Sequence, residues 1–476
     1  MKKPKPKLAA TALSAILLAG CAVGPDYKRP ALEVPAAYKE SSAELGWKQA
    51  EPRDFAPRGS WWAIFRDPQL DGLMAKVEVS NQGIAAAEAQ VRISAALADQ
   101  ARAGFWPTVT GTMQKTESQP SSTTGPIIGQ AATRRTIYSL PLNASWEADL
   151  WGRIRRQVEA GEAGTLASAS DLVNARLSAQ AALAQDYFQL RAYDSQKAQL
   201  DATVAAYEKL LELTRNRYNA GVVSRVDIAQ AETQLNSARA QTLDLGVQRA
   251  QLEHAIAVLI GTPAPGFALA AGELAAAPPP VPAAGVPADL LERRPDVAAA
   301  ERRVEAANAQ IGVAKAAYFP VATLTGAYGY QTANSALWFT AASNFWSVGA
   351  ALALTLIDGG RRAAVSDQAI AGSDQTVANY RGTVLTAFAE VEDNLAALRI
   401  LEAEAAVQDD TVRAAQQSYD ITLNQYKAGI VNFLQVAISQ TALLNAQTTA
   451  LTIRGRRMVA SVLLVKALGG GWNPPQ

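Results

Sequence analysis

The sequence predicts an α+β membrane protein built from a duplicated unit of two β-strands and a long α-helical hairpin. Three observations predict this fold class: one motif occurs twice, prolines are missing from two very long stretches, and short segments between helices alternate apolar with polar residues. Residues 217–236 read RYNAGVVSRVDIAQAETQLN, and residues 425–444 read QYKAGIVNFLQVAISQTALL, at an offset of 208 (429 − 221). A repeat at a fixed offset indicates a duplicated structural unit.

A second match supports the duplication. Residues 85–107, AAAEAQVRISAALADQARAGFWP, resemble residues 298–320, AAAERRVEAANAQIGVAKAAYFP, at an offset of 213 (320 − 107). Because the matches occur in the same order, we divide the chain into a first repeat at 61–260 and a second at 291–470. The remaining segments are a signal peptide (1–20), an extended N-terminal lipoprotein segment (21–60), a Pro-rich linker (261–290) and a C-terminal tail (471–476).

The composition favours long packed helices and excludes several function classes. Hydrophobic residues make up 49% of the 476 residues and charged residues 18%, whereas an average soluble protein has roughly 25% charged residues. The net charge of +1 gives no electrostatic footprint for nucleic acid. One Cys and one His cannot build a zinc site of such ligands or an internal disulfide. His254 lies in the helical run QLEHAIAVLIG, where packing is favoured over catalysis, so we expect neither an enzyme nor a cofactor.

The N-terminus carries a targeting signal. Four lysines precede the apolar stretch Leu8–Ala19, which is too short to span a membrane and is typical of a signal peptide. The sequence LLAGC resembles a bacterial lipoprotein signal, in which Cys21 becomes the lipidated first residue of the mature chain. The alternative is a buried free cysteine. The residue after Cys21 is Ala22 and not an acidic residue. In bacterial lipoproteins this implies delivery to the outer membrane.

The spacing of prolines predicts very long helices. No proline occurs between Pro141 and Pro263 or between Pro320 and Pro474, and proline inside a helix costs about 3 kcal/mol or more. The 67 residues from Arg153 to Asn219 (219 − 153 + 1) would span about 100 Å as one helix. Gly221 and Gly429 are expected to end helices in the left-handed conformation. Each motif is therefore the tip of a helical hairpin, or, in the alternative interpretation, an ordinary coiled-coil tip.

Four segments between the helices alternate as strands do. We expect strands at about 108–117 and 136–150 in the first repeat, and at about 321–331 and 347–358 in the second. Val348, Ala350 and Leu352 share one face of the last strand, which is typical of membrane strands. A soluble β-sandwich would need about seven strands. Four strands cannot close a membrane barrel, because such a barrel needs about eight strands or more. Several chains must therefore contribute strands to one barrel, and three chains would supply twelve.

The chain closely resembles the outer-membrane efflux family, the TolC-like channels, in their lipoprotein branch (NodT-type outer-membrane factors). The motifs that carry the resemblance include CAVGPDYKRP at 21–30, WEADLWGRIRRQ at 146–157, ERRPDVAAAE at 292–301, DGGRR at 358–362 and the two hairpin motifs. The resemblance implies a homotrimer with a 12-stranded β-barrel in the outer membrane, continued by an α-helical barrel through the periplasm. It further implies a passive exit duct for drugs or toxic small molecules.

The same resemblance implies the partners of such a duct. They are a periplasmic adaptor (membrane fusion) protein, an inner-membrane transporter of the resistance–nodulation–division (RND) type driven by protons, and outer-membrane lipid; no nucleic acid is involved. The alternatives are a duct for type I protein secretion and a structural coiled-coil lipoprotein of the envelope. The alternating strands argue against the second alternative, because a scaffold does not need membrane strands.

The hairpin tips are expected to form the periplasmic gate. Relatives often carry acidic residues after the AG pair of the second repeat, whereas Ile430–Gln435 contains none. We therefore expect a constriction that is partly hydrophobic. The gate candidates are Asp227, Arg225, Tyr426, Val431, Leu434 and Gln435. Asp227 either ties the first hairpin to Tyr426 of the second or serves as the N-terminal carboxylate of its own helix. Arg215, Arg217 and Arg225 are taken as solvated surface charges in preference to cations at the mouth.

Overall fold

The computed structural model describes residues 22–32, 34–35, 37–40, 59–121, 133–278 and 293–470. Cys21, the signal peptide, part of the expected linker and the C-terminal tail lie outside these residues. The chain divides into two compact units, which we describe separately. Unit 1 holds the N-terminal residues up to Ala31 together with Val91–Ser168 and Ala300–Tyr380, and unit 2 holds Leu32–Gln90, Ala169–Ala299 and the residues from Arg381 on.

Equal helix lengths confirm the duplicated unit. The helices that lead into the sheet have 22 residues each: α3 (Gln82–Ala103) and α7 (Pro295–Ala316). The helices that leave it have 67 residues each: α4 (Arg153–Asn219) and α8 (Arg361–Lys427). The expected continuous helix from Arg153 to Asn219 is therefore confirmed. The returning helices have 35 residues each: α5 (Arg225–Leu259) and α9 (Phe433–Ala467).

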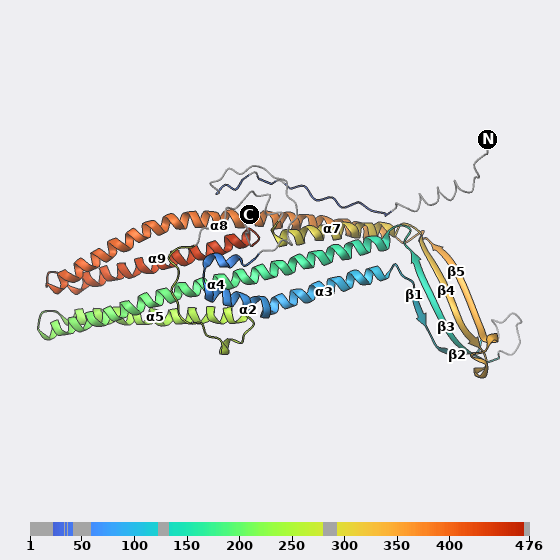
Figure 1. Ribbon diagram of the computed structural model, residues 1–476, viewed down its shortest axis with the longest axis horizontal. Coiled ribbons are helices and arrows are strands. Elements are labelled where there is room, and N and C mark those ends of the chain that lie inside the picture. Colours follow the sequence, from blue (N-terminus) through green and yellow to red (C-terminus); the bar gives the residue numbers. More distant parts are fainter. Residues whose placement is uncertain are drawn as a thin grey trace. The chain divides into compact units, whose positions relative to one another are not determined.

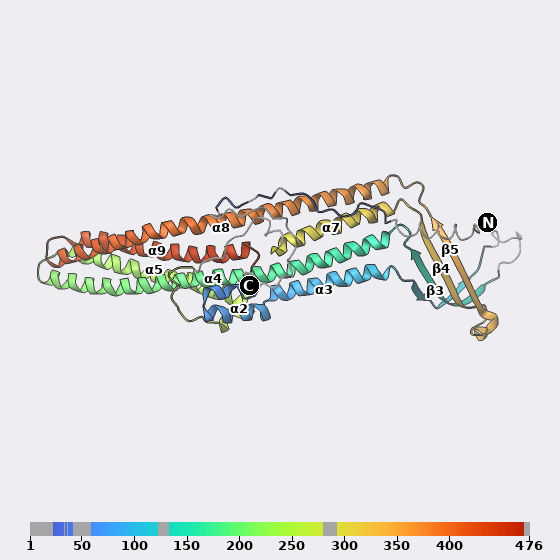
Figure 2. The ribbon, with the colours of Figure 1, turned by 45° about the horizontal axis from the view of Figure 1, so that its top comes forward.

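In unit 2 the long helices form two hairpins. Figures 1 and 2 show α4 folding back into α5, and α8 folding back into α9, with the two hairpin ends side by side. None of the helices in the described part of the chain is both long and apolar enough to cross a membrane.

The strands of unit 1 form one antiparallel sheet. β1 (Thr108–Gly111) and β2 (Gln114–Ser118) both pair with β3 (Arg135–Ala148), β3 pairs with β4 (Val321–Thr332), and β4 pairs with β5 (Asn344–Ala353). The first expected strand is thus split in two at Thr112 and Met113. Thr112 donates its N–H to the carbonyl of Pro141 on β3 (3.2 Å), but Pro141 has no N–H to return, so the ladder is interrupted there.

The last strand ends earlier than the alternation predicts. We expected a strand at 347–358, whereas β5 starts at Asn344 and stops at Ala353. Ala353 pairs with Val321, the first residue of β4, and the residue before it is Pro320, which cannot donate to a ladder. In the described chain Leu354–Asp358 therefore have no strand to pair with, although their apolar alternation continues.

The register places most apolar side chains of β1, β3, β4 and β5 on one face. Val348 of β5 stands opposite Gly326 of β4, which stands opposite Ala144 of β3, which stands opposite Val109 of β1. The adjacent row is polar at three of its four positions: Ser347, Ala327, Asn143 and Thr110. The apolar face is open, with Val348 81% exposed. A sheet with one exposed apolar face and one polar face has the pattern of strands that face lipid on one side.

A compact core fastens the base of the hairpins in unit 2. It is built on η1 (Trp61–Phe65) and α2 (Pro68–Ser80), and its fully buried side chains include Leu70, Met74, Val77, Leu183, Leu190 and Ile256. The N-cap of α2 is Asp67, whose carboxylate accepts the N–H of Leu70 (3.1 Å) and the hydroxyl of Tyr187 on α4 (2.5 Å). One carboxylate thus caps α2 and ties it to α4.

The described start of the linker is held on the helices by a buried charge network. After η2 (Ala264–Gly266), the N–H of Gly272 donates to Asp194 of α4 (3.1 Å). Asp194 also accepts from Arg191 (2.8 Å) and from Arg249 of α5 (2.7 Å). Because the buried carboxylate is fully paired, the network fixes this segment against α4 and α5. The expected linker residues 279–290 lie outside the described part.

Candidate functional site

The two hairpin turns have the same backbone geometry. Gly221 and Gly429 adopt φ values of 73° and 76°, in the left-handed region. The next residue closes each helix: Val222 donates its N–H to the carbonyl of Arg217, and Ile430 donates to that of Gln425, both at 2.9 Å. This pattern is the Schellman motif, in which glycine avoids the steric cost of the left-handed conformation. The expected role of both glycines is confirmed.

Asp227 caps its own helix. α5 begins after Ser224, and the Asp227 carboxylate accepts the backbone N–H of Ser224 (2.9 Å) and its hydroxyl (3.0 Å). This arrangement matches the helix N-terminal alternative for Asp227. In the second hairpin Asn432 stands at the position of Ser224, and its side chain accepts the N–H of Gln435 (3.3 Å), the residue that stands at the position of Asp227.

Tyr426 joins the second hairpin to the first. Its ring is 1% exposed, and its hydroxyl lies 3.1 Å from the hydroxyl of Thr214 on α4. Because Thr214 donates its own proton to the carbonyl of Leu210 (2.9 Å), Tyr426 is the donor. The guanidinium of Arg217 lies over the ring, 4.5 Å from its centroid, and donates to the carbonyl of Tyr426. The partners that tie Tyr426 to the first hairpin are therefore Thr214 and Arg217.

Sequence reasoning missed the role of Arg217. We assigned it to the solvated surface, but it is half-buried against Tyr426. Arg215, two residues earlier, fits that assignment better: it is 56% exposed and pairs with Glu232 of α5 (2.7 Å) within the same hairpin. The sequence did contain a signal for this difference. Residues two positions apart on a helix face different sides, so Arg215 and Arg217 cannot both lie on the same exposed face. The partner on α8 could not be read from the sequence.

A buried apolar cluster lies beneath the two turns. We call it the tip cluster, and its members are Tyr207, Leu210, Leu211, Ala231, Leu235, Ala238, Tyr426, Phe433, Val436 and Ala437. Tyr426 and Phe433 meet edge to face, with centroids 5.9 Å apart. Burial, with a smaller effect from Tyr419, raises the pKa of Tyr207 to about 12. The phenol therefore stays neutral throughout the physiological range.

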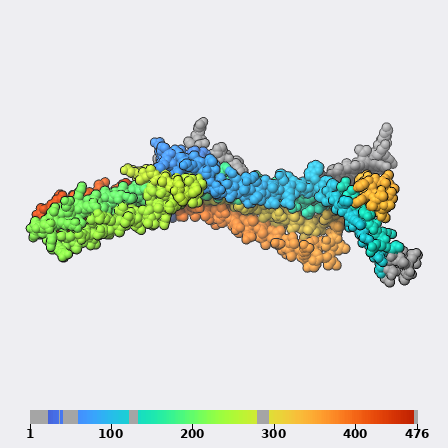
Figure 3. All heavy atoms as spheres, turned by 90° about the horizontal axis from the view of Figure 1, so that it is seen from below, coloured from blue at the N-terminus to red at the C-terminus, as the bar shows by residue number. Residues whose placement is uncertain are grey.

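The other gate candidates surround this cluster. Val431 packs against it and is half-buried, whereas Leu434, Gln435 and Arg225 are exposed. Figure 3 shows the end of the first hairpin (green) as an open surface with residues of the second (red) along its edge. The structure thus brings Tyr426 and Val431 together in the core, and leaves three candidates free to face solvent or a partner.

The two copies are unequal at one matched position. Tyr218 and Tyr426 correspond in the repeat, yet Tyr218 is 42% exposed and Tyr426 is 1% exposed. The inter-hairpin contact therefore uses the tyrosine of the second copy, against the helix of the first.

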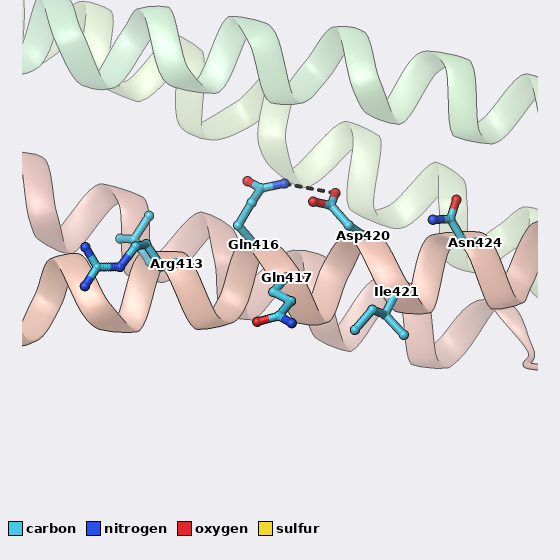
Figure 4. Close-up of a pocket in the computed structure, with 7 residues that line it drawn as sticks. Arg413, Gln416, Gln417, Asp420, Ile421 and Asn424 are labelled. Carbon is cyan, nitrogen blue, oxygen red and sulfur yellow. Dashed lines mark hydrogen bonds between the residues drawn. The ribbon is translucent and has the colours of Figure 1, made fainter.

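One surface depression of the described chain is formed by a single helix. This depression of about 490 Å³ lies on α8 alone and includes Arg413, Gln416 and Asp420 (Figure 4). Gln416 donates to Asp420 (3.0 Å). Among the described residues, no group of three or more His, Cys, Asp and Glu side chains is placed to hold a metal ion.

Comparison with known proteins gives one consistent result. The family model named outer membrane efflux protein matches residues 73–262 and 286–470. The toluene efflux pump outer membrane protein TtgF of Pseudomonas putida is 32% identical over 464 residues, which are 96% of this chain and 95% of the relative. The antibiotic efflux pump outer membrane protein ArpC of the same species is 31% identical over 98% of this chain and 96% of the relative. The solved outer-membrane channel OprN gives a TM-score of 0.85 at 28% identity, over 95% of this chain and all of that one.

Proposed function

Since this chain belongs to the outer membrane efflux protein family, we propose that three copies form the passive outer-membrane exit duct of a tripartite efflux pump. The sheet carries this proposal. It has one apolar face and, within the described chain, two unpaired edges, at β1–β2 and at β5. Open edges are not tolerated in lipid. Joining β5 of each copy to β1 of the next removes them, and three copies of four strand positions give a closed barrel of about twelve strands.

The helical hairpins continue this duct into the periplasm and end in its entrance. The tip cluster joins the two hairpins of one copy, and the contacts of Tyr426 with Arg217 and Thr214 favour the closed arrangement. Asp227 supports the start of α5, while Arg225, Leu434 and Gln435 face the entrance. Val431 supplies apolar surface at its edge. Opening requires the hairpins to separate, and so requires these contacts to be lost.

The cargo and partners follow from the family and from the kinds of pump in which relatives act. Relatives named for toluene and antibiotic efflux support small toxic compounds, drugs among them, as cargo. An inner-membrane RND-type transporter supplies the energy, and a periplasmic adaptor contacts the hairpin tips. The chain supplies a conduit and performs no chemistry.

The segment after Cys21 supports a lipid anchor at that residue. Cys21 itself lies outside the described residues, but the chain from Ala22 onward is bound to unit 1. The N–H of Val23 donates to the carbonyl of Trp151 (3.0 Å), and Asn308 donates to the carbonyl of Pro25 (2.9 Å). Trp151 lies between the end of β3 and the start of α4. A lipid on Cys21 would therefore enter the membrane next to the border between sheet and helices.

Conductance of the purified protein in planar bilayers, together with its mass in detergent, tests the proposal. We expect a trimer with small and infrequent openings. A monomer without conductance would overturn the shared barrel and favour an envelope scaffold. A trimer that passes an unfolded polypeptide, and that passes small solutes of every size, would instead favour a duct for protein secretion.

A further inference from the structure

An aromatic cluster covers the end of the sheet that is farthest along the strands from the helices. The connection between β4 and β5 contains η3 (Ser335–Leu337) and η4 (Ala341–Ser343). Between them, Trp338 and Phe339 stack with centroids 5.6 Å apart. Trp338 lies 5.4 Å from Tyr138 of β3, and Phe339 lies 5.6 Å from Tyr330 of β4. The connection is the golden segment at the end of the sheet in Figures 1 and 2.

This cluster extends the apolar face of the sheet. Side chains two residues apart share a face of a strand, so Tyr138 lies on the face of Leu142, and Tyr330 on that of Tyr328. Lys115 of β2 pairs with Tyr138 in the register, and its ammonium lies over the Tyr138 ring, 5.8 Å from the centroid. Phe339 is the most accessible of these rings, at 69% exposed, whereas Tyr138, Tyr330 and Trp338 are half-buried.

The same end of the sheet carries an excess of positive charge. Residues 113–136 and 326–346 contain three cations, Lys115, Arg134 and Arg135, and one anion, Glu117. Glu117 is engaged by Arg134 at 3.4 Å, a surface pair that contributes little. Each copy therefore has two more cations than anions at this end, next to the aromatic rings.

We propose that this aromatic–basic patch (Lys115, Arg134, Tyr138, Trp338 and Phe339) binds a lipid of the outer leaflet whose phosphate headgroup carries a net negative charge. The inference rests on the proposed function, because the sheet must stand in a membrane. Lys115 and Arg134 hold the phosphate, while the rings pack on the glycerol and the first methylenes, where aromatic side chains are favoured. A zwitterionic headgroup is bound less well, because its cationic group is repelled by the excess of cations at this end.

Native mass spectrometry of the full-length assembly tests the proposal. The protein is incubated with equal amounts of phosphatidylglycerol and phosphatidylcholine of the same acyl chains, and the retained lipids are counted. We expect phosphatidylglycerol to be preferred, and Lys115→Gln to reduce the preference about fivefold, as for one cation removed from an anionic surface. The matched control is Lys209→Gln, which removes an exposed lysine of α4 and should leave the preference unchanged. Phe339→Ala should lower retention of both lipids.

The outcomes separate this inference from the proposed function. Equal retention of the two lipids by a conducting trimer, or an equal loss in Lys115→Gln and Lys209→Gln, would overturn the lipid site and leave the duct intact. Failure to form a conducting trimer would overturn both. Inorganic phosphate at millimolar concentration should not displace the lipid; if it does, the patch is a site for free phosphate and the lipid assignment is wrong.

Discussion

Under the proposed function, in which the hairpin tips form the entrance of the duct, the contact between Arg217 and Tyr426 predicts how strongly that entrance is held closed. Changing Arg217 to Ala removes a cation over an aromatic ring, worth about 0.5–2 kcal/mol, and a charged hydrogen bond to a carbonyl, worth about 1.5–3 kcal/mol. Because Arg217 is half-buried, solvent competes with both, and we take the lower bounds. The loss is then about 2 kcal/mol per chain, which corresponds to an increase of about thirtyfold in the ratio of open to closed hairpins.

Single-channel recording of the reconstituted trimer measures this ratio as open probability. Arg215→Ala is the matched control: it removes a cation two residues away, whose partner Glu232 lies in the same hairpin. Separation of the two hairpins leaves that pair intact, so open probability should stay within about twofold of the original. Tyr426→Phe removes one neutral hydrogen bond to Thr214, worth about 1 kcal/mol, and should raise open probability about fivefold. If Arg217→Ala and Arg215→Ala open the channel equally, the reasoning fails.

Four further predictions follow from other parts of the structure. Gly429→Ala forces a β-carbon into the left-handed conformation and should lower the free energy of unfolding by about 1–2 kcal/mol, measured by chemical denaturation. Asp227→Ala removes a helix cap and should lower it by about 0.5–2 kcal/mol with unchanged conductance; a large change of conductance would instead implicate Asp227 in the gate. Val348→Arg on the apolar face should reduce the yield of membrane-inserted trimer on a gel, since a cation facing lipid costs about 2–4 kcal/mol, whereas Ser347→Arg on the polar face should not. Tyr207 has a raised pKa of about 12, so its contribution to stability is complete below about pH 10 and is lost as the pH rises toward 12. Tyr207→Phe should therefore make thermal stability depend less on pH across that interval. An unchanged slope of thermal stability against pH would contradict this account.

The sequence predicted those parts of the fold that depend on local chemistry. The 67-residue span of α4 follows from the absence of proline and from the glycine that ends it, and both turns follow from the requirement for glycine at Gly221 and Gly429. The strands follow from alternation along the chain. These features depend on residues that are close together in the sequence, so they can be predicted from the sequence of one chain.

The features that the sequence did not predict depend on a residue elsewhere in the fold. The break between β1 and β2 is caused by Pro141 on the neighbouring strand, and the end of β5 by the start of β4 after Pro320. The different environments of Tyr218 and Tyr426 arise because the hairpins pack against each other in one particular way. A tyrosine present in both copies of a motif does not show which copy supplies the contact.

Equal helix lengths limit how this chain can change during evolution. One residue inserted into α4 would advance its end by about 1.5 Å and rotate it by about 100°. Arg217 would then turn away from Tyr426, whose position is set by α8. Substitutions along the helices can accumulate one at a time, but a change of length must occur in both hairpins together, or in steps of about 7 or 11 residues that restore the facing side. The length of the helical hairpins can therefore change only in fixed steps during evolution. The side chains along the helices, in contrast, can change one residue at a time.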